Sequence, residues 1–215
     1  MCEALTDLGV QVHMIRRSNE FIPWLDKDLS DAVQNHALER GVGLHFKQGL
    51  KGVEERKGRL CVHSDSMEFE TDLVLLALGV VPNSSLALEA GLGLGPHKEI
   101  AVNKALESSV EHIYAAGDCA DAYHVVTEKK IWLPLALRAN RAGWAVADSV
   151  CGNRTELPGI SGTAVFKFFD YQVARTGLTC TEAKDHGFDA VERVIKTRSR
   201  AHAQPSSTEI RVQVV

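Results

Sequence analysis

A short stretch that ends at Asp118 reads Ile-Tyr-Ala-Ala-Gly-Asp and contains residue types that could hold a ligand. Small residues at Ala115, Ala116 and Gly117 would let the backbone approach a bound group closely. The Asp118 carboxylate would follow a short buried strand, Ile113–Ala115, and could accept hydrogen bonds from hydroxyl groups. Because open α/β sheets bind ligands at the carboxyl ends of their strands, the stretch predicts a clamp for sugar hydroxyls. A strand that leads into an Asp-capped turn is the alternative.

Residues 108–118, which read Ser-Ser-Val-Glu-His-Ile-Tyr-Ala-Ala-Gly-Asp, resemble a motif of a known family. It is the second flavin-binding motif of the FAD-dependent pyridine nucleotide-disulfide oxidoreductases. The resemblance extends over nearly the whole chain. It is greatest to the single-cysteine branch, which contains coenzyme A-disulfide reductases, NADH oxidases and NADH peroxidases. It implies that Asp118, with Gly117 and Cys119 beside it, contacts the ribityl and phosphate region of FAD.

The residues around Pro134 predict the start of a helix, with Pro134 as its first residue, where a missing N–H costs nothing. The resemblance implies that Leu135 and Ala136 lie at the flavin, and the positive helix end would stabilise charge on reduced flavin. Residues 139–143 read Ala-Asn-Arg-Ala-Gly and resemble the family's Ala-Asn-Arg-x-Gly pattern, with Trp144 in place of an arginine. The position of Asn140 can face substrate in relatives, so Asn140 is predicted to be a substrate residue.

The N-terminal residues predict the second half of a nucleotide-binding βαβ unit. A helix over Met1–Leu8, a stop at Gly9 and a strand over Val10–Ile15 are followed directly by Arg16 and Arg17. A carboxylate at this strand end binds the ribose 2′-hydroxyl of NAD, whereas an arginine accommodates the 2′-phosphate of NADP. The two arginines therefore predict NADP, with NAD as the second choice. A solvated basic strand end is the alternative.

No Gly-x-Gly-x-x-Gly turn occurs in the 215 residues, although both nucleotide sites of the family need one to hold a pyrophosphate. We therefore expect an incomplete chain or a misplaced start, and a chain that is colourless and inactive when expressed alone. The resemblance places the nucleophilic cysteine of the family in an N-terminal FAD segment that this chain lacks, so no catalytic residue is predicted. Cys119 follows a possible helix start, which lowers a thiol pKa, but a small buried thiol is the favoured interpretation.

The fold class expected from the resemblance is α/β, with Rossmann-like FAD/NAD(P)-binding domains followed by part of an α+β dimerisation domain. Residues 1–80 would form the NAD(P) domain, residues 81–153 the C-terminal part of the FAD domain, and residues 160–215 the incomplete dimerisation domain. Residues 72–83 resemble the family's Asp-x-Val-x-x-Ala-x-Gly-x-x-Pro-Asn segment. There Leu73–Leu78 predicts a buried parallel strand, and Gly79 is implied to approach the nicotinamide closely.

Local patterns predict the remaining elements. A helix over Asp26–Arg40 should bury Leu29, Val33, Ala37 and Leu38 and end at Gly41. Strands are expected over Val42–Phe46 and Ile100–Asn103, and a hairpin is expected around Lys57-Gly58. In the last part of the chain, a helix over Thr181–His186 with Thr181 as its cap and a strand over Ala190–Thr197 are expected.

Composition limits the classes of partner. The net charge of −4 argues against nucleic acid, and the longest apolar run, Leu73–Leu78, is too short to span a bilayer. The five cysteines are widely spaced and the nine histidines form no cluster with ligand spacing, which favours reduced thiols in a cytoplasmic protein without disulfides or metal.

The predicted function is transfer of hydride from NAD(P)H via FAD to a disulfide, persulfide or peroxide, in a homodimer most like coenzyme A-disulfide reductase. Relatives that reduce coenzyme A disulfide carry a tyrosine-rich turn after the position of His202. Residues 203–207 contain no tyrosine, which weakens the coenzyme A assignment. A non-catalytic nucleotide-binding or interaction module that has lost the redox half is the alternative.

Overall fold

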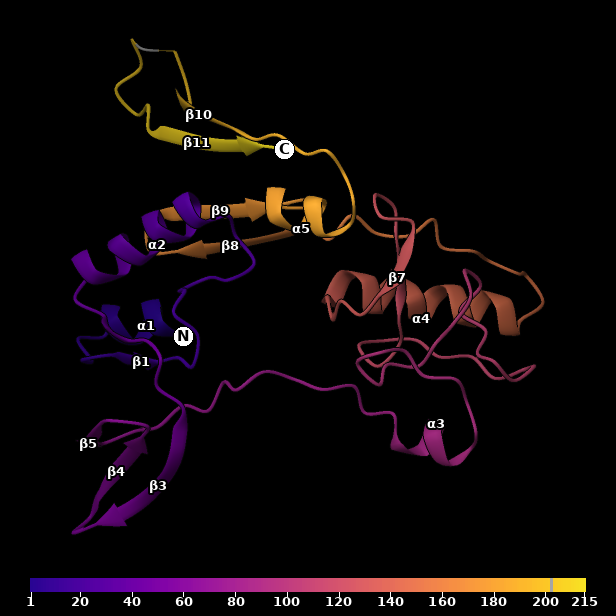
Figure 1. Cartoon of the computed structure of the whole chain (residues 1–215), viewed down its shortest axis with the longest axis horizontal. Coiled ribbons are helices and arrows are strands. Elements are labelled where there is room, and N and C mark those ends of the chain that lie inside the picture. The colour runs from indigo at the N-terminus through magenta and orange to yellow at the C-terminus, as the bar shows by residue number, and fades with distance from the viewer. Residues whose placement is uncertain (202) are drawn as a thin grey trace. The chain divides into compact units, whose positions relative to one another are not determined.

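The computed structural model describes residues 1–201 and 203–215 and consists of two compact units (Figure 1). One unit combines Met1–Leu76 with Val165–Val215, and the other is Ala77–Ala164. His202, the residue before the turn that lacks tyrosine, lies outside the described residues. Within the described part of the chain, no helix has the length and apolar character needed to cross a membrane.

The N-terminal part of the first unit is a small parallel α/β element. Helix α1 (Cys2–Asp7) leads into β1 (His13–Ile15), which pairs in parallel with β2 (Gly43–His45), and helix α2 (Lys27–Glu39) connects the two strands. Both strands are shorter than the predicted Val10–Ile15 and Val42–Phe46. Helix α2 begins after Asp26 and ends before Gly41, whose φ of 80° is readily adopted only by glycine.

Helix α2 buries Val33 and Ala37, as its apolar periodicity predicts. The prediction that Leu38 belongs to the same buried face is wrong, because Leu38 is 50% exposed. Each helical residue turns by about 100°, so Leu38 lies beside rather than on the row formed by Val33 and Ala37. The core around this row also contains Phe169 and Val173 of a C-terminal hairpin. The complete core consists of Phe21, Ile22, Leu25, Val33, Ala37, Val42, Phe169 and Val173.

A three-stranded antiparallel sheet follows, built from β3 (Leu50–Arg56), β4 (Arg59–Ser64) and β5 (Glu68–Thr71). The predicted hairpin turn is confirmed. Lys57 and Gly58 have φ values of 52° and 80°, which is the geometry of a two-residue type I′ turn. The register places Glu54 opposite Cys61 and His63 opposite Glu68.

The prediction that Leu73–Leu78 forms a buried strand is wrong. These residues are extended without strand pairing among the described residues, and Figure 1 draws the segment as a plain trace. Leu73 and Leu78 are 64% and 77% exposed. A parallel strand is buried only where other strands flank it and helices cover both faces. In the described part of this chain, β1 and β2 pair only with each other.

Two hairpins and a short helix complete the first unit: β8 (Ala164–Phe168), β9 (Tyr171–Arg175), α5 (Cys180–Asp185), β10 (Arg193–Arg198) and β11 (Glu209–Val214). The cap of α5 is Thr179 rather than the predicted Thr181. The Thr179 hydroxyl accepts from the Glu182 amide at 3.1 Å, and the Glu182 carboxylate accepts from the Thr179 amide at 2.9 Å. This reciprocal capping box needs Thr and Glu three residues apart, a spacing that Thr181 does not have.

The second unit contains α3 (Ser85–Glu89), the hairpin β6 (Ala122–His124) and β7 (Lys129–Ile131), and the long helix α4 (Ala136–Val150). The predicted strands Ile100–Asn103 and Ile113–Ala115 are wrong as extended strands, because only isolated bridges form there. Leu106 and His112 have φ values of 65° and 64°, so the backbone turns repeatedly between these segments. The core of this unit contains Ala87, Leu92, Ile100, Val102, Leu106, Ala115, Ala120, Ala142 and Ala145.

Candidate flavin and nucleotide sites

The loop of residues 117–121 is the candidate flavin site of the second unit. It is a turn that leads directly to β6 and not the predicted helix start. Gly117 has a φ of 94°, and a Cβ built on it would meet no atom within 4 Å, so the space beside its backbone is open. Asp118 is exposed, and its carboxylate has no hydrogen-bond partner among the described residues. Its backbone carbonyl accepts a bond of 2.7 Å from the Trp132 indole. The loop thus combines a close-approach glycine with an available carboxylate.

A buried arginine of helix α4 holds this loop. Arg138 is only 7% exposed, and its guanidinium donates to the Gly117 carbonyl at 2.8 Å, to the Ala120 carbonyl at 3.2 Å and to the Asp121 carbonyl. Burial lowers the pKa of Arg138, and the neighbouring Asp121 carboxylate opposes that change. Five donors in a rigid fork suit an arginine to several carbonyls at once.

Sequence reasoning missed Arg138. The available signal was its spacing in the helix, because Arg138, Ala142 and Ala145 recur at four and three residues and therefore share one face. Both alanines are fully buried in the core of this unit. An arginine on such a face must find acceptors inside the protein.

Asp121 fixes the far end of the loop. Its side chain is buried, and Oδ1 accepts from the Val102 amide at 3.2 Å and from Lys130 Nζ at 2.9 Å. Lys130 also donates to the Val102 carbonyl. The ion pair therefore joins the loop, the 100–103 segment and β7. A carboxylate paired in this way is structural, so Asp118 is the acid of this loop that faces solvent.

Helix α4 follows the β6–β7 hairpin, but it does not begin where the sequence predicts. Its first residue is Ala136 and Leu135 is the N-cap, so Pro134 precedes the helix instead of occupying its first position. Leu135 has an extended backbone and a side chain that cannot accept a hydrogen bond, so no side chain caps the first amides. Such amides, together with the helix dipole, favour an electron-rich partner. Asn140 is exposed on α4, three residues after Leu137 and four before Trp144, which are also exposed.

The two arginines of the predicted NADP site differ in their environment. Arg16 is half-buried, and its Nη1 donates to the Phe21 carbonyl at 2.7 Å, which closes the loop after β1. Arg17 is exposed. Arg17 is therefore the arginine of this pair that is available to a phosphate.

The remaining predicted residue, Gly79, lies in the extended segment with a φ of 98°, and a Cβ built there would meet no atom within 4 Å. The structure brings Gly117, Asp118 and Cys119 together in one loop that α4 holds. Arg16 and Arg17 belong to the other compact unit.

Three of the cysteines, Cys2, Cys61 and Cys119, resemble structural thiols. Cys119 is partly buried, with Sγ 3.5 Å from the Ala116 carbonyl. Burial raises the pKa of both Cys2 and Cys61, and a raised pKa lowers the fraction of reactive thiolate.

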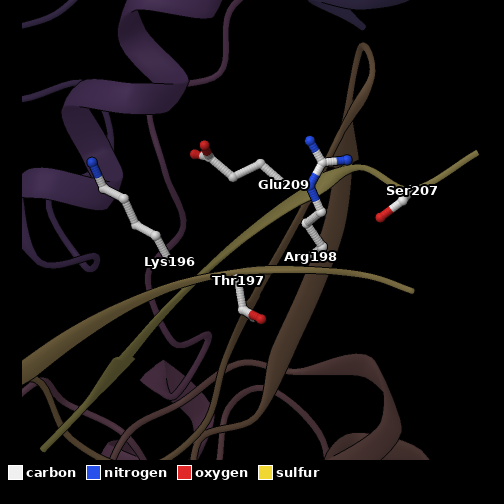
Figure 2. A pocket seen from close by; sticks show the side chains of 5 residues that line it. All are labelled: Lys196, Thr197, Arg198, Ser207 and Glu209. Carbon is white, nitrogen blue, oxygen red and sulfur yellow. The ribbon is translucent and has the colours of Figure 1, made fainter. Parts of the chain in front are cut away.

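The hollow in Figure 2 lies on the β10–β11 hairpin. It has a volume of about 260 Å³ and is lined by Lys196, Thr197, Arg198, Ser207 and Glu209. The Thr197 side chain points away from the side that carries Lys196 and Arg198 (Figure 2). None of the predicted site residues lines this hollow, so the loop at Asp118 remains the candidate site.

Comparisons with known proteins show the family of the chain. The family model of the pyridine nucleotide-disulphide oxidoreductases matches residues 1–143. A curated NAD(P)H sulfur oxidoreductase (CoA-dependent) from Pyrococcus furiosus is 35% identical over 98% of this chain and 48% of its own length. An NADH oxidase from Enterococcus faecalis is 28% identical over 100% of this chain and 49% of its own length. The chain thus spans about half the length of these relatives.

Solved structures show the same relationship. A NAD-dependent persulfide reductase from A. fulgidus superposes with a TM-score of 0.91 and 33% identity, covering 99% of this chain and 40% of that one. An engineered water-forming NADPH oxidase bound to NADPH gives a TM-score of 0.91 and 26% identity, covering 99% of this chain and 47% of that one.

Proposed function

Because the chain belongs to the pyridine nucleotide-disulphide oxidoreductases, we propose that it is the nucleotide-binding part of an FAD-dependent NAD(P)H oxidoreductase. The complete protein would pass hydride from NAD(P)H via FAD to a disulfide, persulfide or peroxide, and would be most like a coenzyme A-disulfide reductase. The observation that carries the proposal is the 117–121 loop. Its backbone is held by the buried Arg138, while the exposed Asp118 carboxylate has no hydrogen-bond partner among the described residues.

The described residues fit FAD at this loop. Gly117 leaves open space beside its backbone, and the exposed Asp118 carboxylate is an acceptor for ribityl hydroxyls. The uncapped amides after Leu135 would face the electron-rich edge of the flavin. FAD would supply the two-electron carrier between nicotinamide and substrate. The chain would bind and orient it, and in this proposal Cys119 packs beside the cofactor without reacting.

We propose NADPH as the preferred reductant, with Arg17 as the contact to its 2′-phosphate. Arg16 supports this contact indirectly, since its bond to the Phe21 carbonyl fixes the loop on which Arg17 lies. The engineered oxidase offers a parallel. Its substitutions convert an Asp-Ala-Met run into Ala-Arg-Ser, and it was crystallised with NADPH. This chain reads Arg-Arg-Ser at residues 16–18 and has no acid there.

For the electron acceptor we propose a persulfide or a small disulfide. Two similar proteins have names that refer to sulfur or persulfide reduction. Asn140 on the exposed side of α4 is the proposed substrate contact, and Gly79 is proposed to approach the nicotinamide. The absence of tyrosine from residues 203–207 argues against strict dependence on coenzyme A.

The proposed assembly is a homodimer in the cytoplasm. On one side of the β10–β11 hairpin, Ile195, Ile210, Val212 and Val214 are exposed, and an apolar face of this kind favours contact with a second copy. The five free thiols suit a reducing compartment.

A chimera tests the proposal. This chain would replace the matching segment of the Pyrococcus furiosus relative, which supplies the segments that the chain does not span. We expect a yellow protein that oxidises NADPH in the presence of a persulfide. Asp118→Ala should release the flavin, because buried cofactor hydroxyls lose a charged acceptor worth about 1.5–3 kcal/mol. Asp118→Asn should be milder.

Asp148→Ala, at an exposed aspartate of α4, is the matched control and should retain the flavin. Full flavin occupancy in Asp118→Ala would show that the loop is only a structural turn. A folded but colourless chimera would favour the second candidate, a non-catalytic nucleotide-binding or interaction module.

A further inference from the structure

The three-stranded sheet of the first unit carries metal-ligating side chains on one face. Side chains alternate between the two faces of a strand, so Cys61 and His63 on β4 lie on the same side. Directly opposite residues share a face as well, which brings Glu54 of β3 next to Cys61 and Glu68 of β5 next to His63. The neighbouring strands thus supply a thiol, an imidazole and two carboxylates to one place.

The ligand atoms of Glu54, Cys61 and His63 all lie within 4.8 Å of one another. His63 Nε2 is 3.3 Å from Glu54 Oε1. Two ligands of a tetrahedral ion, each about 2.0–2.1 Å from it, lie about 3.3–3.4 Å apart. We propose that Glu54, Cys61 and His63 form a zinc site on this sheet, in which Cys61 Sγ, His63 Nε2 and one Glu54 oxygen bind the ion.

Glu68 orients the histidine for this role. His63 Nδ1 lies 3.1 Å from Glu68 Oε2, so an Nδ1–H bond to the carboxylate leaves the Nε2 lone pair directed toward Glu54. A carboxylate behind a ligating imidazole is the usual second contact of a zinc histidine. Cys61 Sγ also lies 3.4 Å from Glu68 Oε1, and the same carboxylate therefore contacts both predicted ligands.

The charges of the cluster suit a divalent cation. Arg56 pairs with Glu54 and with Glu68 at 2.5 Å each, so the two carboxylates and the arginine carry a net charge of −1. Binding converts the Cys61 S–H to a thiolate–metal bond and releases its proton to solvent. The resulting charge of −2 balances a doubly charged ion. Because His63 Nε2 and Arg56 Nε both contact Glu54 Oε1, an ion bound between His63 and this oxygen would displace Arg56 from it, and Arg56 would keep its contact with Glu68.

The types of ligand atom in the cluster favour zinc, and the exposed ligand side chains let an ion enter from solvent. One sulfur, one nitrogen and one carboxylate oxygen form the mixed set that Zn²⁺ accepts, whereas Mg²⁺ and Ca²⁺ require oxygen ligands. The Cys61 side chain is buried, but the His63 and Glu54 side chains are 29% and 50% exposed. An ion can thus enter from solvent, and a water molecule would complete the tetrahedron.

The test uses Co²⁺ as a spectroscopic substitute for Zn²⁺. The reduced, purified 215-residue chain, with its fold verified by far-ultraviolet circular dichroism, is titrated with Co²⁺ without oxygen. We expect a thiolate-to-cobalt charge-transfer band in the near ultraviolet that saturates at one equivalent. One equivalent of Zn²⁺ should remove it, because zinc binds N/O/S sites more tightly than cobalt.

Variants assign the ligands. Cys61→Ser should abolish the band, whereas Cys151→Ser, at an exposed cysteine, should leave it unchanged. His63→Gln and Glu54→Gln, at partly exposed positions that tolerate substitution, should each weaken Co²⁺ binding at least tenfold. Glu68→Gln should keep the band and weaken Co²⁺ binding about 10- to 100-fold, because removing the carboxylate that hydrogen-bonds a ligating histidine has this effect in other metal sites. A band that survives in Cys61→Ser would overturn the proposal. So would a folded wild-type chain without a band, or unchanged affinity in both His63→Gln and Glu54→Gln.

Discussion

Arg138 and Arg16 both donate hydrogen bonds to backbone carbonyls of a loop, but they lie in different surroundings. Arg138 in the second unit donates to three carbonyls of the 117–121 loop, and Arg16 in the first unit donates to the Phe21 carbonyl. Each closes a loop that we assign to a nucleotide site. Arg138 is 7% exposed and embedded in an alanine-lined core, whereas Arg16 is half-buried beside the exposed Arg17.

The difference shows how burial sets the importance of a hydrogen bond. At Arg16, loss of the guanidinium would leave one carbonyl, in a partly buried bond, without its donor. At Arg138, it would leave the buried Ala120 and Asp121 carbonyls unsatisfied, together with the partly buried Gly117 carbonyl. The flavin loop therefore depends on a distant helix, while the loop at the nucleotide strand end depends mainly on residues close to it in sequence.

The largest expected effect follows from replacing Arg138 with Met. This change keeps much of the side-chain volume and removes all three bonds, so we expect the free energy of unfolding to fall by about 3 kcal/mol. Urea denaturation of the chain measures it. Arg141→Met, at an exposed position of the same helix, should change stability by less than about 0.5 kcal/mol. Equal effects of the two substitutions would contradict the special role of Arg138.

The second prediction separates the neighbours Arg16 and Arg17. In the chimera, Arg17→Ala should weaken NADPH binding about 10- to 100-fold, since a charge-assisted bond to phosphate is lost. Its stability should be unchanged. Arg16→Met should instead lower the free energy of unfolding by about 1 kcal/mol.

The double change of Arg16→Glu with Arg17→Ala should shift preference toward NADH. Competition binding with NADPH and NADH gives the answer. Unchanged selectivity in the double variant would rule out this strand end as the determinant of cofactor choice.

A third arginine region extends the comparison. Arg175 contacts the Trp24 and Gly177 carbonyls and Glu182, just before helix α5. The Thr179–Glu182 capping box also stabilises this region. We therefore expect Thr179→Ala to lower the free energy of unfolding by about 1 kcal/mol. Thr181→Ala, the matched substitution at the cap expected from sequence, should have little effect. The opposite result would restore Thr181 as the cap.

The smallest effect concerns pH and the loop of Arg16, whose amide donates to the His45 carbonyl at 2.8 Å. Burial, and secondarily the neighbouring His13, lower the pKa of His45. Below about pH 6.5, His45 therefore binds more protons in the unfolded chain than in the folded chain. The contribution of neutral His45 to the free energy of unfolding is complete above about pH 6.5 and is lost as the pH falls through the lower folded pKa. His45→Gln should flatten this dependence in urea unfolding curves between about pH 5 and 7. His112→Gln, at an exposed histidine, should leave it unchanged. Identical slopes in wild type and His45→Gln would refute the assignment.

The sequence by itself determined the features that depend on near neighbours. Lys57-Gly58 specified a type I′ hairpin because both positions adopt positive φ, and Asp26 and Gly41 marked the limits of α2. The motif at residues 108–118 was sufficient to identify the family, because close approach to a cofactor restricts residue types strongly. The capping residue of α5 was misassigned by two positions even though its signal is local.

Only the tertiary structure decided which side chains are committed and which are available. Arg138 meets carbonyls 17 to 21 residues earlier in the chain, and the partner of Arg16 lies in the following loop. Cys61 and His63 alternate along β4, but they indicate a metal site only together with the glutamates that β3 and β5 place beside them. Leu73–Leu78 has the composition of a buried strand, yet it is exposed because no described strand pairs with it. Composition states what a segment could bury, whereas burial itself requires partners that are distant in sequence.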